Sequence, residues 1–373
     1  MSSPIKGLKG IMAADSTICR VDGTEGRLVF RGYSIDDLAS NATYEEVVWL
    51  LLKGELPSQQ ELTEFQLQLG EAAILPQPVT AYIETAPATH PMAILRTAVS
   101  ILGTCDTTAE DGSDEANLRK AVRLIATLPT IVAAIRRVLG DKTPVTPDPE
   151  RSRAEDFIRM LNGRDATADE TRSMDLILTV HAEHGFNAST FTARVIAATL
   201  TDMYSAVTGA IGALKGKLHG GANTEVLRTL QKIGSVEAVA DWVSQAREAK
   251  KKFMGFGHAV YQVADPRAKF LKEMSARLAA ETGDSKWYDM SVEMERHVVA
   301  AINRQCNVDF YSASVQHYLG VPAEVFTCVF AASRVSGWCA HILEQVSDNK
   351  IIRPSSNYVG PELRPWQSLG SRS

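Results

Sequence analysis

Apolar residues along this chain recur mostly at the spacing of amphipathic helices. Stretches with this period cover about 91–102, 115–139, 167–184, 188–214, 235–249, 266–282, 288–305 and 322–346. Another helix is predicted between Thr43 and Gly54, because Thr43 and Glu46 have the spacing of a capping box and glycine commonly follows a helix. Clusters of glycine and proline separate these stretches. The pattern predicts an all-α protein.

Two segments add detail to this helical pattern. Residues 16 to 31 hold two β-prone runs around Asp22, Gly23 and Gly26, which predicts a small N-terminal β-hairpin. Residues 193 to 216 are rich in alanine, glycine, serine and threonine. Because small side chains let helices approach closely, this segment predicts a tightly packed pair of helices, either in the core or at a subunit interface.

Composition narrows the class of protein. The 373 residues are enough for two domains, and 45% hydrophobic with 22% charged residues is typical of a globular chain. A net charge of -5 gives no general attraction to nucleic acid. No uninterrupted apolar run is long enough to span a bilayer, and the N-terminus lacks the apolar core of a secretory signal. Five scattered cysteines without a CxxC pair are typical of reduced thiols. We therefore expect a cytoplasmic protein that binds neither nucleic acid nor membrane.

Histidines are the first candidate functional residues. Four of the eight lie in short groups or beside glycine: His181 and His184 in HAEH, His219 in LHGG and His258 in GFGH. Glycine leaves room for backbone or a ligand to approach the imidazole. His219 also precedes a helix-prone run, and a helix N-terminus there would favour the neutral imidazole as a hydrogen-bond donor. The alternative is that each is an ordinary hydrogen-bonded core histidine in a turn.

The HAEH string also raises the question of a metal. It places His181 and His184 at i and i+3, on one face of the predicted helix, with Glu183 between them. The string is not HExxH, and no cysteine or acidic cluster supplies a third ligand at suitable spacing. No metal is predicted.

Arginines on apolar segments indicate an anion. Arg267 lies in DPRAKF, Arg334 lies in an otherwise apolar helix, and Arg353 directly precedes a proline. A buried guanidinium is costly unless it meets an anion, and its planar fork matches a carboxylate. Three such residues would hold a dicarboxylate, although structural salt bridges explain any one of them equally well.

Two further features complete the candidate chemistry. Residues 250 to 258, KKKFMGFGH, combine lysines with a glycine-rich turn that offers charge and backbone N–H groups to phosphates; a solvated helix end is the alternative. Asp309 lies at a helix junction among apolar and aromatic residues, as either a helix cap or a base whose pKa is raised by burial. These residues predict a site for a small anion and a phosphate-bearing partner, without naming the reaction.

The chain resembles the citrate synthase family in eight ordered strings. They are VFRGYSIDDLA, HPMAILRTAVS, HAEHGFNASTFTAR, LHGGAN, GFGHAVYQVADPRAKF, NVDFYSA, SRVSGWCAHILEQ and IIRPSSNYVGP. The resemblance implies a two-domain helical fold, with residues 1–220 and 325–373 forming a large domain and 221–324 a small domain that carries the CoA loop. It also implies a homodimer with shared active sites, or a higher oligomer.

The resemblance assigns roles to three residues of the reaction. His219 matches the histidine that hydrogen-bonds the thioester carbonyl as it becomes an enol or enolate. Asp309 matches the base that removes the α-proton. His258 matches the residue that polarises and protonates the oxo group under attack. An α-proton of a thioester is weakly acidic, so its removal needs both a carboxylate and a donor at the developing oxyanion.

The remaining carried-over positions bind substrates. His184, Arg267 and Arg334 match oxaloacetate-binding positions, and Arg353 matches the arginine that reaches the carboxylate from the neighbouring subunit. Lys252, Gly255, Phe256 and Gly257 lie in the string expected beside CoA. The chain departs from prokaryotic relatives at Ala259 and Gln262, where arginine and lysine are common. CoA phosphates would then be bound more weakly, or be met by residues 250–252.

The activity implied is a transferase reaction of the tricarboxylic acid cycle. Acetyl-CoA condenses with oxaloacetate, and hydrolysis then yields citrate and CoA; no cofactor is bound permanently, and the CoA thioester is a co-substrate. The nearest alternative is 2-methylcitrate synthase, which uses propionyl-CoA, since one methylene is worth only about 1–3 kcal/mol of discrimination. A non-catalytic ligand-binding or assembly member of the family, and a metalloenzyme built on HAEH, are the remaining alternatives.

Overall fold

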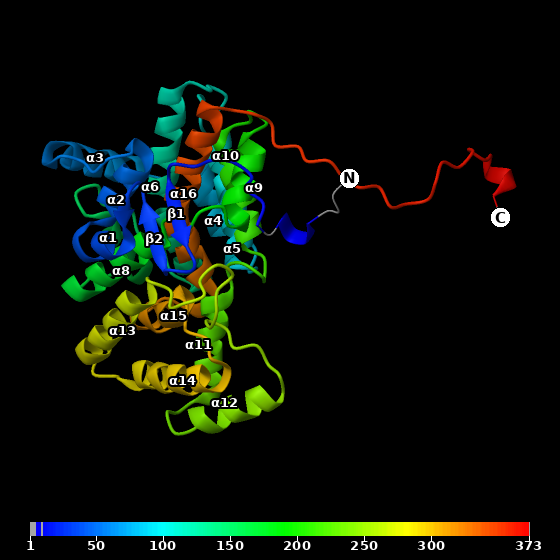
Figure 1. Ribbon diagram of the computed structural model, residues 1–373. Helices are drawn as coiled ribbons and strands as arrows, with labels where there is room; N and C mark the ends of the chain where they lie inside the picture. The colour runs from blue at the N-terminus through cyan, green and yellow to red at the C-terminus, as the bar shows by residue number, and fades with distance from the viewer. Residues whose placement is uncertain (1–4, 9, 373) are drawn as a thin grey trace.

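A computed structural model describes residues 5–8 and 10–372 of the chain, which form sixteen α-helices and one small sheet (Figure 1). The sheet is antiparallel in the order β1 (Cys19–Asp22), β2 (Arg27–Phe30) and β3 (Tyr33–Ser34). Cys19 pairs with Phe30, and Asp22 pairs with Arg27 across the turn. The predicted hairpin is therefore confirmed, with β3 as an additional short strand. The all-α fold class is confirmed too.

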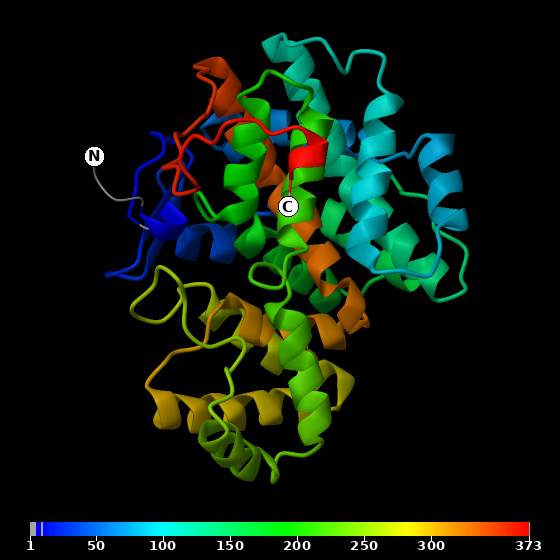
Figure 2. The same cartoon turned by 90° about the vertical axis from the view of Figure 1, so that its right-hand side faces the viewer.

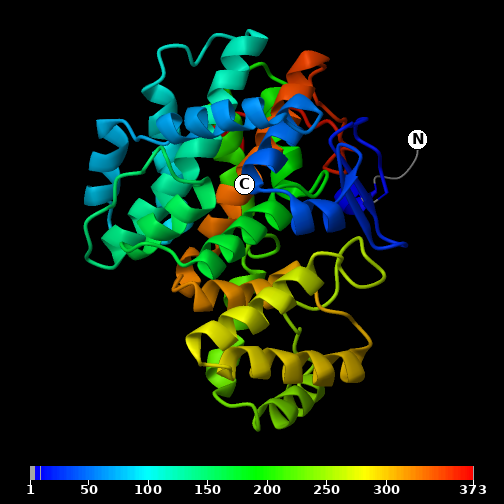
Figure 3. The ribbon, with the colours of Figure 1, turned by 90° about the vertical axis from the view of Figure 1, so that its left-hand side faces the viewer.

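Eleven of the helices form the larger, upper part of the molecule in Figures 1 to 3. They are α1 (Ile35–Asn41), α2 (Tyr44–Lys53), α3 (Gln59–Ala72), α4 (Gln77–Thr85), α5 (Pro91–Thr104), α6 (Asp114–Leu139), α7 (Arg153–Asn162), α8 (Ala168–His181), α9 (Ala188–Ala197), α10 (Met203–Leu214) and α16 (Phe326–Ser347). Three short 3-10 turns are η1 (Lys6–Leu8), η2 (Ala323–Val325) and η3 (Leu369–Ser371).

The other five helices lie together in the lower part of the molecule (Figures 1 and 3). They are α11 (Ala222–Ile233), α12 (Val239–Glu248), α13 (Ala268–Thr282), α14 (Lys286–Ile302) and α15 (Val308–Tyr318). They come from one continuous stretch of chain, between α10 and α16. That this stretch moves as a domain with bounds near 221–324 stays a proposal.

Local signals in the sequence fix most helix ends. Thr43 and Glu46 form the expected capping box, and Gly54 ends α2 with a positive φ of 96°. The apolar period over 188–214 covers two helices, α9 and α10, which pack against each other, as the small side chains of 193–216 predicted. Leu200 adopts a positive φ of 63°, and the Asp202 side chain then accepts the Ser205 N–H to start α10. Apolar periodicity alone did not reveal this break.

Helix α16 is the centre of the larger part. It packs against α6, α8, α9 and α10, and nearly every residue from Phe326 to Ile342 is buried. The segment Ala323–Ser347 is long and apolar enough to cross a membrane by length and composition alone, but its most apolar window is completely buried within the protein. A core helix passes the same test, so this segment is weak evidence for a membrane span.

The C-terminal segment after α16 extends away from the body of the protein (Figure 1). Residues 350–368 have no regular secondary structure, and all but Ile352 are exposed, including Arg353. Tyr358 and Trp366 are 76% and 81% exposed. Large apolar side chains gathered on an exposed segment are typical of a surface that another protein chain covers.

Candidate active site

Six predicted site residues lie far apart in sequence, five of them in connections or at helix ends and one within a helix. His184 lies between α8 and α9, His219 between α10 and α11, and His258 between α12 and α13, while Arg267 is the N-cap of α13, Asp309 is in the first turn of α15 and Arg334 is within α16. Charge interactions link them: Arg267 and Arg334 both lower the pKa of His184, which burial lowers most, and both act on Asp309. The fold therefore gathers these six residues into one site.

The HAEH string is not the continuous helix that its spacing predicted. Helix α8 ends at His181, and the chain then turns, so the two histidines do not share a helix face. Burial lowers the pKa of His181 to about 3, and its Nδ1 hydrogen-bonds the carbonyl of Ile177 at 2.9 Å, the contact of a core histidine. The turn lies against Gly337 of α16, where a Cβ atom would clash with Ala182 and Glu183. That close approach places His184 beyond the helix end.

A network of hydrogen bonds that includes one ion pair links the turn before His184 to α16. Glu183 accepts hydrogen bonds from Gly185 N and from His341 Nε2, the latter at 2.9 Å. The other nitrogen of His341 lies 3.2 Å from Arg194, which also pairs with Glu344 at 2.7 Å. Arg194 and Glu344 neutralise each other, and Glu183 is held by hydrogen bonds from Gly185 and His341. The network fixes the backbone that carries His184.

His184 and His258 face each other at the site. Their ring centroids are 5.1 Å apart, and His184 Nε2 lies 3.1 Å from the hydroxyl of Tyr261. His258 Nδ1 accepts the N–H groups of Val260 and Tyr261 at 3.0 and 3.2 Å. Because Nδ1 is an acceptor, the proton of the neutral ring is on Nε2. Burial, followed by Arg267, lowers the pKa of His258, so the neutral donor form is favoured.

His219 has the opposite tautomer. Its Nε2 accepts the Ser189 N–H at 3.3 Å and lies 2.8 Å from the Ser189 hydroxyl, which in turn accepts Trp338 Nε1–H at 3.1 Å. The ring proton is therefore on Nδ1. Burial, then Arg334, lowers the pKa of His219 to about 4. Burial is the largest cause of this shift. His219 precedes α11, which begins at Ala222, and the expected contribution of that helix dipole stays a prediction.

Asp309 is a half-buried carboxylate of the site. Burial raises its pKa to about 6; Arg267 and Arg334 lower the pKa and Asp265 raises it. Asp309 is not the helix cap, because Asn307 has that position and accepts the Asp309 N–H at 3.0 Å. Its carboxylate therefore has no capping role and is available as a base with a pKa near neutrality.

Arg267 is held by a residue that the sequence reasoning missed. Asp265 accepts two hydrogen bonds from the guanidinium, at 2.9 and 2.8 Å, and also accepts Val308 N–H at 3.1 Å. Burial opposes the charge of Arg267, but Asp265 outweighs burial and raises the arginine's pKa. Asp265 thus fixes Arg267 to the start of α15. The signal was present, since Asp265 stands two residues before Arg267 in DPR.

Arg334 is fully inside the protein. Its Nε donates to the carbonyl of His181 at 2.6 Å, and its guanidinium lies 4.8 Å from the centroid of Phe330. Burial lowers its pKa to about 10. Among the described residues, no carboxylate forms a salt bridge with Arg334, so this cation is suited to bind an anion in the site.

The remaining predicted site residues lie either in the glycine-rich loop, residues 255–257, or on the exposed surface. Phe256 pairs with Cys306 in an isolated β-bridge and packs against Phe310 at 4.6 Å, while Gly255 has a positive φ and a Cβ there would crowd Phe310. The glycine-rich loop thus lies directly beside α15. Lys252 and Arg353 are exposed, and this single chain does not bring either of them to the six-residue cluster.

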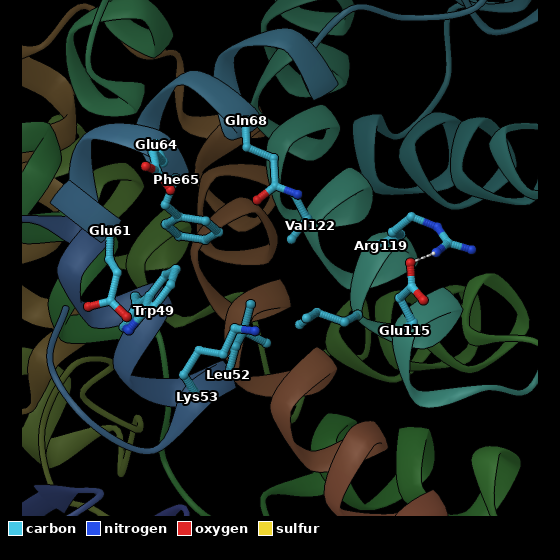
Figure 4. Close-up of a pocket in the computed structure, with 11 residues that line it drawn as sticks. Trp49, Leu52, Lys53, Glu61, Glu64, Phe65, Gln68, Glu115, Arg119 and Val122 are labelled. Carbon is cyan, nitrogen blue, oxygen red and sulfur yellow. Dashed lines mark hydrogen bonds and ion pairs between the residues drawn. The ribbon is translucent and has the colours of Figure 1, made fainter. Parts of the chain in front are cut away.

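One cavity adjoins the site, and a second lies away from it. One of about 360 Å³ is lined by His258, Tyr261, Gln262, Asp265 and residues 303–307. Another of about 540 Å³ lies between α2, α3 and α6, over Trp49 and Phe65, with the Glu115–Arg119 ion pair of 2.8 Å on its rim (Figure 4). It contains none of the predicted site residues. Within the described part of the chain, no group of three His, Cys, Asp or Glu side chains is arranged to hold a metal ion.

Fold and site together define an all-α protein with a half-buried carboxylate, histidine donors and arginines, a set suited to forming an enolate beside a dianion. The family model "Citrate synthase, C-terminal domain" matches residues 7–355. The chain belongs to the citrate synthase family. It is thus an acyltransferase of the citrate (Si)-synthase type, which joins acetyl-CoA to oxaloacetate and releases citrate and CoA.

Individual relatives agree with this membership over their full length. Citrate synthase 2 of Bacillus subtilis is 46% identical over 370 residues, 99% of both chains. A 2-methylcitrate synthase of Shewanella oneidensis is 42% identical, covering 98% of this chain and 97% of the relative. Citrate synthase of Thermoplasma acidophilum, solved as a ternary complex with carboxymethyl coenzyme A and oxaloacetate, is 32% identical over 100% of both chains, with a TM-score of 0.94.

Proposed function

We propose that the six-residue cluster is the catalytic centre for condensing acetyl-CoA with oxaloacetate. The observation that carries this proposal is Asp309, a half-buried carboxylate with a pKa near 6, together with two histidines whose free N–H groups are set by backbone contacts. A base of this strength and donors that keep their protons at neutral pH are what thioester enolisation requires.

Each group has one task. Asp309 removes the α-proton of the acyl group while His219 Nδ1–H hydrogen-bonds the thioester oxygen, where negative charge develops. The enolate carbon attacks the oxo carbon of oxaloacetate, and His258 Nε2–H donates its proton to the oxo oxygen as the new C–C bond forms. Water then hydrolyses the condensed thioester to citrate and CoA. The tautomers derived from Ser189 and Val260 support these two donor assignments.

Oxaloacetate is proposed to bind beside His184, Arg267 and Arg334. Arg334 supports this role because its charge is buried without a carboxylate partner among the described residues. Arg267 is already paired with Asp265, so its positive charge is partly neutralised. It would therefore orient the substrate more than supply an unpaired charge. His184 is neutral and next to Tyr261, which suits hydrogen bonding to a carboxylate.

The acid limb of the pH profile follows from Asp309. The base acts as a carboxylate, whose fraction falls as pH falls through its raised pKa of about 6. We expect kcat/KM for acetyl-CoA to drop about tenfold per pH unit below that value. The pKa of His219 is lowered to about 4, so this ring stays neutral over most of the same range, and the pKa of His258 is lowered as well. A profile that stays flat to about pH 5 would rule out Asp309 as the titrating base.

Comparison of acyl donors tests the proposed function directly. We expect release of free CoA with oxaloacetate and acetyl-CoA, and a lower kcat/KM with propionyl-CoA by at least about tenfold, the effect of one misplaced methylene. A preference for propionyl-CoA would establish the 2-methylcitrate reaction instead, since relatives with that activity are nearly as similar. No release with either donor would contradict catalysis altogether.

A homodimer in the cytoplasm, with Arg353 shared between subunits, is also proposed, as is closure of residues 221–324 over the substrates. The exposed apolar side chains of the C-terminal segment support the dimer. Five free cysteines support a reducing compartment. Closure would bring Asp309 and His258 toward Arg334, and would exclude the water that protonates an enolate.

A further inference from the structure

Residues 303–307 join α14 to α15 and run antiparallel to the loop that carries His258. Gly257 N–H donates to the carbonyl of Gln305 at 2.9 Å, and Asn307 donates from its backbone to Gly255 and from its side chain to Gly257, at 2.9 and 2.8 Å. A Cβ added at Gly257 would lie 4.0 Å from Cδ of Arg304. These contacts fix Arg304 beside the His258 loop, although 46 positions separate the two in sequence.

Arg304 is a cation without a counter-ion at the mouth of the site. It lines the 360 Å³ cavity together with His258, Gln262 and Asn303. It is exposed, and no carboxylate of the described residues forms a salt bridge with it. The one acidic residue of the lining, Asp265, is already paired with Arg267. The mouth therefore carries net positive charge.

No other side chain of the cavity lining supplies this charge. Positions 259 and 262 of the loop are alanine and glutamine, and Lys250, Lys251 and Lys252 do not line the cavity. Acyl-CoA has an uncharged reactive end and a phosphorylated nucleotide at the other. If the thioester reaches His219 and Asp309, the phosphates remain on the outer side of the site. A guanidinium is well suited to bind phosphate oxygens in a bidentate pair.

We propose that Arg304 binds a phosphate group of CoA, so that the α14–α15 connection provides the charge that the His258 loop lacks. The inference rests on the proposed function of this site and adds a binding residue to it. Both the 5′-diphosphate and the 3′-phosphate of CoA present the required chemistry.

Arg304→Gln tests the proposal by separating KM from kcat. We expect KM for acetyl-CoA to rise about tenfold or more, the usual effect of losing a charge-assisted hydrogen bond, while KM for oxaloacetate changes less than about threefold. Arg304→Lys should recover part of the loss. Raising the salt concentration should raise KM of the unmodified enzyme more than that of Arg304→Gln, because the lost interaction is the screened one.

The matched control is Arg296→Gln. Arg296 is exposed on α14, pairs with Glu293 at 2.7 Å and does not line the cavity, so the substitution removes the same net charge elsewhere on the same part of the chain. An equal rise in KM for both glutamine variants, or an unchanged KM in Arg304→Gln with an unchanged melting temperature, would overturn the proposal.

Two further measurements test the proposal. The first does not depend on turnover, and the second identifies which phosphate of CoA Arg304 binds. Calorimetric binding of CoA itself to Arg304→Gln and to the unmodified protein tests Arg304 even if neither acyl-CoA is turned over. With dephospho-CoA, which lacks the 3′-phosphate, an affinity that no longer depends on Arg304 identifies the 3′-phosphate as its partner. An affinity that still depends on Arg304 identifies the diphosphate, and equal affinities of both proteins for CoA and dephospho-CoA reject the contact.

Discussion

Asp309→Asn should lower kcat by about 10²–10⁴, the contribution of a general base, with a much smaller change in oxaloacetate affinity. Asparagine retains the size of the side chain, and the helix cap at Asn307 is independent of it. The loss therefore isolates the proton transfer. Steady-state kinetics and calorimetric binding of oxaloacetate measure the two quantities separately. Near-normal turnover would mean that another group is the base.

A second substrate separates the base from a general disturbance of the site. The condensed thioester, supplied as substrate, needs hydrolysis but no α-proton removal, so Asp309→Asn should retain more of this activity than of the full reaction. Asp241→Asn, an exposed position in the first turn of α12, removes the same charge and should leave both activities intact. Equal loss of hydrolysis and condensation in Asp309→Asn would indicate a structural rather than a chemical role.

Local features of this fold were predictable because their causes are local. The capping box of α2 needs only Thr43 and Glu46, three residues apart, and the hairpin needs only its turn residues. The end of α8 was not predictable from apolar period, since the period continues through Glu183. The turn that follows α8 packs against Gly337, more than 150 positions away, where a side chain would clash with Ala182 and Glu183.

The candidate site likewise combines features that the sequence predicted with features that only the structure shows. Residue types in short strings indicated a histidine, arginine and aspartate site, and resemblance to the family supplied their roles. The tautomers came only from the structure, because they depend on Ser189 beside His219 and on the turn at Val260 beside His258. The same holds for Arg304, whose position beside Gly257 follows from backbone pairing between two distant segments.

Mixing Arg353→Ala with His258→Ala, each nearly inactive alone, should restore activity if subunits exchange. Arg353 precedes a proline, which favours an extended backbone, and it is exposed on the C-terminal segment that extends away from the body of its own subunit. If it serves the partner's pocket, a mixed dimer has one pocket with His258 and Arg353 both intact, and one pocket with both defects. At random exchange about half of the dimers are mixed, so total activity should reach about a quarter of the unmodified level when pockets act independently.

A second mixture of variants distinguishes a residue that serves the partner's pocket from one that serves the pocket of its own chain. His258→Ala and Asp309→Asn both act in the pocket of their own chain under the proposed mechanism, so every pocket of their mixed dimer keeps one defect and mixing should restore nothing. Both mixtures contain His258→Ala, and they differ only in the second variant. If exchange is demonstrated with labelled subunits and the Arg353→Ala mixture also stays inactive, Arg353 serves its own chain, and the active site is not shared.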